Sequence, residues 1–147
     1  MKIEIAEARL YHCGQIARAV RPAQSLGARA RGVNAHRELQ ARLSASAYAR
    51  TCWLDGRLAA LGGVMGTMAE SDGLVWLAIA DWATKHPKAL LRAARQALIE
   101  IGATKRRLGT LILIEDAASF RFARRLGFVV QESADTPFET ILMERAA

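Results

Sequence analysis

The segment from Gly109 to Glu132 constrains the fold of this chain more than any other part. Thr110 to Ile114 is an uninterrupted apolar run, which is typical of a strand buried on both faces. Asp116 is a favourable helix N-cap residue, and the pattern after it predicts a helix over residues 117–126. Phe128 to Gln131 is a second apolar run. Two strands joined by a helix are parallel or linked by a crossover, so this segment indicates an α/β fold.

Hydrophobic periodicity predicts the other elements. Further strands are expected over residues 2–8, 47–54, 58–65, 74–80 and 138–143, and further helices over 10–20, from the N-cap Asn34, and over 87–102. Asp55-Gly56-Arg57 predicts a hairpin, because both central residues of a type I′ turn need a positive φ. We expect strand 74–80 to be central, strand 138–143 to lie at an edge, and Arg21 to Gly32 to be a flexible basic loop.

Composition limits the classes of protein that the chain can be. Its 147 residues suit one domain over 1–147, and no apolar run reaches the length of a membrane span. Cys13 and Cys52 are outside any C-x-x-C pair and are expected to be buried thiols in a reducing compartment. The net charge of +7 suits nucleic acid, an anionic cofactor or an acidic protein surface, but Arg-rich codon usage explains it equally well.

The order of the predicted elements is β-α-α-β-β-β-α-β-α-β-β, and one motif within it is specific. Asp116 is followed three residues later by Ser119, then by Phe122-Ala123, two arginines and Leu126-Gly127-Phe128. The order and this motif resemble the GNAT N-acetyltransferases, which have Asn, a small residue, an aromatic-Tyr pair and Leu-Gly-Phe at these positions. The resemblance covers nearly the whole chain. It implies an α/β fold with a mixed central sheet of about seven strands and four helices.

The resemblance also implies a cofactor and a site for it. In the GNAT family the pantetheine arm of acetyl-CoA pairs with the fourth strand, and the pyrophosphate lies at the N-terminus of the next helix. The cofactor-binding residues implied in this sequence are Val75, Leu77, Ala78, Lys85, His86, Lys88, Asp116 and Ser119.

Two departures from the family bear on this site. The phosphate-binding segment, residues 81–88, contains no glycine, so side chains obstruct a close backbone approach, and Pro87 lacks an N–H donor. Ala123 stands where many GNAT enzymes have the tyrosine that protonates the departing thiolate. Asp81 and Glu115 are the carboxylates nearest the site, as candidate catalytic bases or as capping and arginine-pairing groups.

The chain resembles the GNAT-like proteins of short-tailed phages in these departures, in its long basic loop and in the segment from Trp76-Leu77 to Asp81-Trp82. Two functions therefore stay open. The first is a structural or virion-associated binding protein that has weakened or lost acetyl-CoA chemistry. The alternative is an active acetyl-CoA-dependent N-acetyltransferase acting on an amine of a protein or small molecule.

The same features of the chain suggest its partners and its location. The expected partners are virion proteins, nucleic acid bound through the basic surface, or a second copy of the chain paired through the last strand. No membrane partner is expected, and the expected location is the host cytoplasm or the virion. His12, His36 and His86 are too scattered to indicate a metal site.

Overall fold

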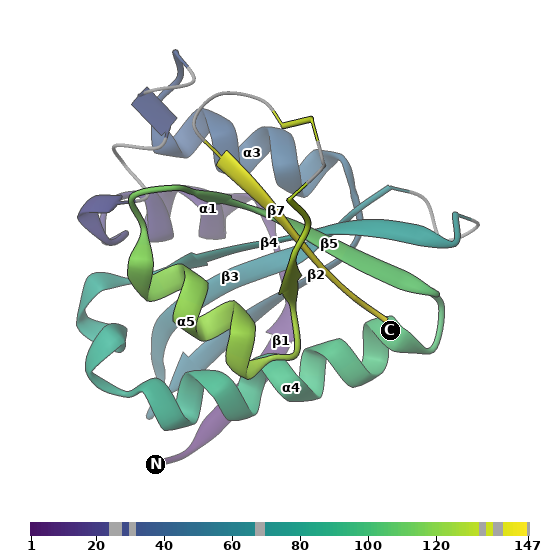
Figure 1. Cartoon of the computed structure of the whole chain (residues 1–147). Helices are drawn as coiled ribbons and strands as arrows, with labels where there is room; N and C mark the ends of the chain where they lie inside the picture. The colour runs from purple at the N-terminus through teal and green to yellow at the C-terminus, as the bar shows by residue number, and fades with distance from the viewer. Residues whose placement is uncertain (24–27, 30–31, 67–69, 133–134, 137–139, 147) are drawn as a thin grey trace.

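A computed structural model describes residues 1–23, 28–29, 32–66, 70–132, 135–136 and 140–146. A seven-stranded mixed sheet has the order β1-β2-β3-β4-β5-β7-β6, with helices α1 and α3 on one face and α4 and α5 on the other (Figure 1). The strands are β1 (Ile3–Glu7), β2 (Ser46–Leu54), β3 (Arg57–Met65), β4 (Asp72–Ile79), β5 (Arg107–Leu113), β6 (Val129–Val130) and β7 (Thr140–Ala146). The helices are α1 (Leu10–Ala17), α3 (Ala35–Ser44), the 3-10 helix η1 (Asp81–Lys85), α4 (Pro87–Gly102) and α5 (Ala117–Arg125).

The first four strands form an antiparallel arm. Leu54 of β2 pairs with Arg57 of β3 across a two-residue turn. Asp55 has φ 48° and Gly56 has φ 80°, which is the left-handed geometry that a type I′ turn requires. The hairpin prediction is therefore confirmed.

The second half of the sheet contains one corrected prediction. β4 and β5 are parallel and joined through α4, as expected. β7 is not an edge strand, because it pairs with β5 along its whole length and with β6 on its other side. The edges of the sheet are β1 and the short strand β6. On the side away from β5, β6 pairs with Met143 and Glu144 of β7. Residues 138–139 of the predicted strand lie outside the described residues.

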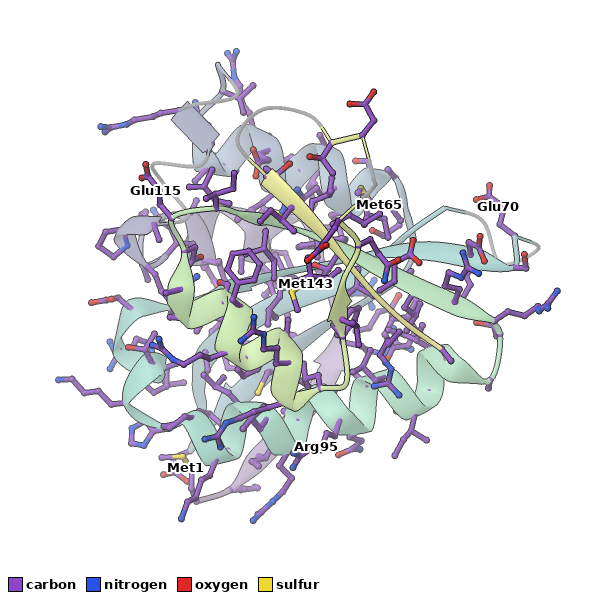
Figure 2. The ribbon with its side chains drawn as sticks, in the orientation of Figure 1. Met1, Met65, Glu70, Arg95, Glu115 and Met143 are labelled. Atoms are coloured by element: carbon purple, nitrogen blue, oxygen red, sulfur yellow. The ribbon has the colours of Figure 1, made fainter. Side chains whose placement is uncertain are left out.

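Two groups of buried side chains hold the helices to the sheet. Cys13 and Ile16 of α1 belong to the first, and Leu108 and Met143 belong to the second, which α5 covers. Figure 2 shows Met143 inside the fold and Arg95 pointing away from it. Both cysteines are free and buried, as expected.

The segment after α1 also departs from the prediction. α1 ends at Ala17 rather than near Val20, because Val20 forms an isolated antiparallel bridge with Ala80 beside β4. Within the range expected to be a loop, the described residues 22–23 and 28–29 are helical. No helix in the described parts of the chain is long and apolar enough to cross a bilayer.

A candidate cofactor site between β4 and β5

The sheet opens into a wedge between its two parallel central strands. Pairing of β4 with β5 stops at Leu74 and Gly109, although β4 continues to Ile79 and β5 to Leu113. The predicted contacts Val75, Leu77 and Ala78 all lie on the part of β4 beyond this last pair. A parallel pair that separates in this way makes room for an extended ligand against a strand edge.

A short segment following α1 crosses the wide end of the wedge. We call Ala19–Arg21 the strap. The Arg21 backbone N–H donates to the Ile79 carbonyl (3.1 Å), and the Asp81 N–H donates to the Ala19 carbonyl (2.7 Å). The Ala80 N–H donates instead to Ala59 of β3 (2.8 Å), so the strap lies on the side of β4 that faces β5.

The Arg21 side chain completes the crossing by reaching the start of α5. Its Nη2 lies 2.8 Å from Oδ2 of Asp116 and donates to Ser119 Oγ at 2.9 Å. Only 12% of the Arg21 side chain and 11% of the Asp116 side chain are exposed. The structure thus brings the predicted contacts Asp116 and Ser119 together, but around an arginine that the sequence analysis had assigned to a flexible loop.

Asp116 is fully engaged in this arrangement. Its Oδ1 accepts the Ser119 backbone N–H (3.2 Å), which caps α5, and its Oδ2 accepts the Ser119 hydroxyl (2.6 Å). Burial alone would raise the pKa of this carboxyl, but the hydrogen bonds from Arg21 and Ser119 outweigh burial and leave the pKa lowered. Asp116 is therefore held as a carboxylate.

The two candidate bases lie at the ends of the two diverging strands. Asp81 begins η1, just after β4, and Glu115 lies between β5 and α5 (Figure 2). Both are exposed, and neither carboxylate forms an ion pair with any residue that the structure describes. Ala123, at the position of the family's tyrosine, is only 4% exposed and packs in the second core group.

The turn from β4 to α4 is packed by side chains, where the family has a glycine-rich loop. Ala83 of η1 is completely buried, and the Arg57 guanidinium stacks 4.4 Å from the centre of the Trp82 ring. Lys85, His86 and Lys88 flank the start of α4, with Lys85 and Lys88 exposed. The two lysines suit an anion by charge, but the backbone cradle that glycines would provide is replaced by η1.

A basic face lies on the outer side of α4 and α5. Its members are exposed and share no ion pair with the described part of the chain: Lys88, Arg92, Arg95, Arg121, Arg124 and Arg125. The two helices meet where Arg95 Nη2 donates to the Arg125 carbonyl (3.5 Å). Nothing in the packing of the fold requires these charges, since they face solvent.

Comparisons with known proteins find the fold but no near relative. No family model and no curated protein match the chain. The PaiA N-acetyltransferase from Thermoplasma acidophilum, solved in complex with coenzyme A, matches with a TM-score of 0.68 at 15% identity, covering 100% of both chains. A GNAT-family acetyltransferase from Streptococcus pneumoniae matches with a TM-score of 0.62 at 15% identity over 99% of both chains.

A third solved structure agrees with these two. The microcin C7 self-immunity acetyltransferase MccE, in complex with acetyl-CoA and AMP, has a TM-score of 0.71 at 10% identity, covering 99% of this chain and 93% of that one. Identities this low establish fold alone. The chain has the GNAT acetyltransferase fold. Over the residues that the structure describes, it has the predicted seven-stranded mixed sheet, with the four α-helices α1, α3, α4 and α5 on its two faces.

Proposed function

We propose that the protein is an acetyl-CoA-dependent N-acetyltransferase that takes its cofactor into the wedge between β4 and β5. The observation that carries the proposal is the early end of the β4–β5 pairing at Leu74 and Gly109. Neighbours of the same fold, including PaiA and MccE, are described as bound to coenzyme A or acetyl-CoA. This function is better supported than a purely structural role.

The residues around the wedge fit acetyl-CoA in part. Val75, Leu77 and Ala78 would hold the pantetheine arm along β4, and Lys85, His86 and Lys88 would attract the phosphates. The fit is incomplete at the strap, because Arg21 holds Asp116 and Ser119. The proposal therefore requires Arg21 to leave Asp116 when the cofactor binds.

Acetyl-CoA would supply an acetyl group activated as a thioester. The chain's part is to position the acceptor amine and to take up the proton that the amine loses on acylation. Asp81 and Glu115, which follow β4 and β5, are the proposed bases for this proton. Ala123 has no ionisable group, so it would leave protonation of the departing thiolate to water.

Calorimetric titration with acetyl-CoA tests the proposal. Saturable binding in the micromolar range, followed by thiol release in the presence of a primary amine, supports it. An absence of heat at millimolar acetyl-CoA contradicts it. The matched control is coenzyme A, which has the same adenine ring and phosphates but no acetyl group. It should bind, and no reaction should follow.

A second candidate, a nucleic-acid-binding protein, is favoured by the basic face. Six exposed cations on α4 and α5 lie without acidic neighbours in ion-pair contact among the described residues. Binding through phosphate contacts weakens steeply with salt. Fluorescence anisotropy with a labelled DNA duplex at about 50 and about 200 mM salt should show a large loss of affinity.

Charge-removal variants identify the surface responsible for any DNA binding. Replacing Arg92, Arg95 and Arg124 with glutamine should reduce both the affinity and its salt dependence. Arg37→Gln, an exposed arginine on α3 of the opposite face, is the matched control. Equal losses in both proteins would exclude the basic face as the contact surface.

A further inference from the structure

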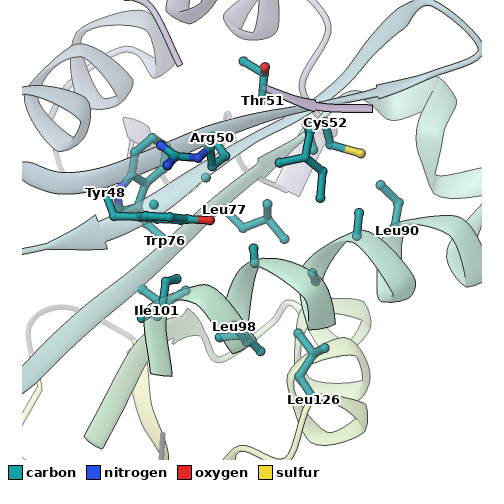
Figure 3. A pocket seen from close by; sticks show the side chains of 18 of the residues that line it. Tyr48, Arg50, Thr51, Cys52, Trp76, Leu77, Leu90, Leu98, Ile101 and Leu126 are labelled. Carbon is teal, nitrogen blue, oxygen red and sulfur yellow. The ribbon is translucent and has the colours of Figure 1, made fainter. Parts of the chain in front are cut away.

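A cavity of about 100 Å³ lies between α4 and the sheet (Figure 3). Small residues create it. Ala93, Ala94 and Ala97 line it from α4, and Ala60 and Gly62 line it from β3. Side chains this short cannot span the gap between a helix and a sheet, and protein interiors rarely leave such gaps unfilled.

The walls of the cavity connect it to the wedge. Val75 and Leu77, which line it, also lie on the stretch of β4 that has separated from β5. Figure 3 shows Leu77 directed from the sheet toward α4. Phe122 and Leu126 of α5 line the same cavity, so the helix that follows β5 contributes to it together with β4.

Polar groups are confined to one end of the cavity. The Tyr48 hydroxyl donates to Oε2 of Glu100 at 2.6 Å, and the Arg50 guanidinium stacks 4.2 Å from the centre of the Tyr48 ring. These groups satisfy one another across the gap between β2 and α4. Apart from Thr51 and Cys52 of β2, the remainder of the lining is aliphatic, aromatic or glycine, which suits an alkyl chain better than a phosphate or an amine.

We propose that this cavity receives the acyl chain of a donor longer than acetyl-CoA, with the thioester beside Val75 and Leu77. An engineered apolar cavity of about 150 Å³ holds benzene, so a cavity of this size suits a straight chain of about four carbon atoms beyond the acetyl group. The inference rests on the proposed function, because it needs acyl-CoA in the wedge. It specifies the substrate class as acyl-CoA of about six carbons.

Affinity as a function of chain length tests the inference. Acetyl-, butanoyl- and hexanoyl-CoA are titrated into the wild-type protein by calorimetry. Burial of one methylene group can increase affinity by up to about fourfold. Hexanoyl-CoA carries several more methylene groups than acetyl-CoA, so even partial burial of them should make it bind at least about tenfold more tightly. Equal affinity for all three overturns the inference and leaves the proposed function standing. No binding of any of them overturns the proposed function together with the inference.

A second test of the inference fills the cavity with a larger side chain. Ala97→Leu should abolish the preference for hexanoyl-CoA while leaving acetyl-CoA affinity within about twofold. Ala94→Val is a smaller filling change that serves if Ala97→Leu does not fold, as judged by circular dichroism. Ala41→Leu makes the same substitution at an exposed position of α3 and should change nothing. A folded filling variant that keeps the full chain-length preference contradicts the assignment.

Discussion

Nη2 of Arg21 lies 2.8 Å from Oδ2 of Asp116, joining residues that are 95 positions apart in the chain. The contact ties the strap that borders β4 to the first residue before α5, which follows β5. One ion pair thereby spans the wide end of the wedge. Its removal should affect cofactor binding and stability in opposite directions.

Arg21→Met should increase the affinity for acetyl-CoA, because the cofactor no longer has to displace the guanidinium from Asp116. Hydrogen bonds to charged groups contribute about 1.5–3 kcal/mol, so an increase of roughly tenfold is expected in calorimetry. The same variant should be less stable to urea by about 2 kcal/mol, because it leaves a buried carboxylate without its cation.

Asp116→Asn is the control for Arg21→Met. The amide keeps an oxygen that can cap α5 and removes the buried charge, so Arg21→Met/Asp116→Asn should regain stability and keep the higher affinity. Weaker acetyl-CoA binding in Arg21→Met would show instead that Arg21 is itself a cofactor contact.

The stability of the wild-type protein should fall in acid through Asp116. The folded-state pKa of this carboxyl is lowered from its ordinary value of 3.8. Its contribution is therefore fully present above pH 3.8 and is lost as the pH falls through the lower folded-state value. Urea unfolding at intervals between about pH 6 and pH 2 measures this loss, since linkage relates the slope to proton uptake. The free energy of unfolding of Asp116→Asn should fall less steeply in acid than that of the wild type. An identical fall in the two proteins would refute the assignment of this loss to Asp116.

Removing cations at the start of α4 should weaken acetyl-CoA binding. Lys85→Gln and Lys88→Gln should each reduce the affinity by up to about fivefold at low salt, because a cation near the phosphates is lost. Arg124→Gln, at the far end of α5, should have little effect. The difference should shrink at about 1 M salt, where the Debye length is about 3 Å. A loss that is independent of salt would argue against a charge-based phosphate site.

Tyr48 should remain protonated at alkaline pH. Burial, together with its hydrogen bond to Glu100 and the charge of that carboxylate, raises the pKa of Tyr48 well above its ordinary value of 10.0. The stability that the neutral phenol contributes is present below pH 10.0 and is lost as the pH rises further. Urea unfolding between about pH 9 and pH 11.5 should therefore show a steeper decline in the wild type than in Tyr48→Phe. Parallel declines in the two proteins would contradict the prediction.

Short-range chemistry in the sequence determined most of the local structure. Asn34 caps α3 by accepting the Arg37 N–H at 2.8 Å, Pro87 opens α4, and Gly127 follows α5 with φ 94°. Each rests on an interaction within a few residues, which the sequence displays directly. The motif from Asp116 to Phe128 indicated the fold for the same reason.

Only the tertiary structure decided how distant segments meet. It placed β7 inside the sheet, because pairing with β5 satisfies its backbone where alternation alone suggested an edge. Arg21, in a range expected to be a loop, forms a buried ion pair with Asp116. The pairing of β4 with β5 ends at Leu74. No local pattern encodes these contacts, because their stability comes from burial and pairing between residues far apart in the chain.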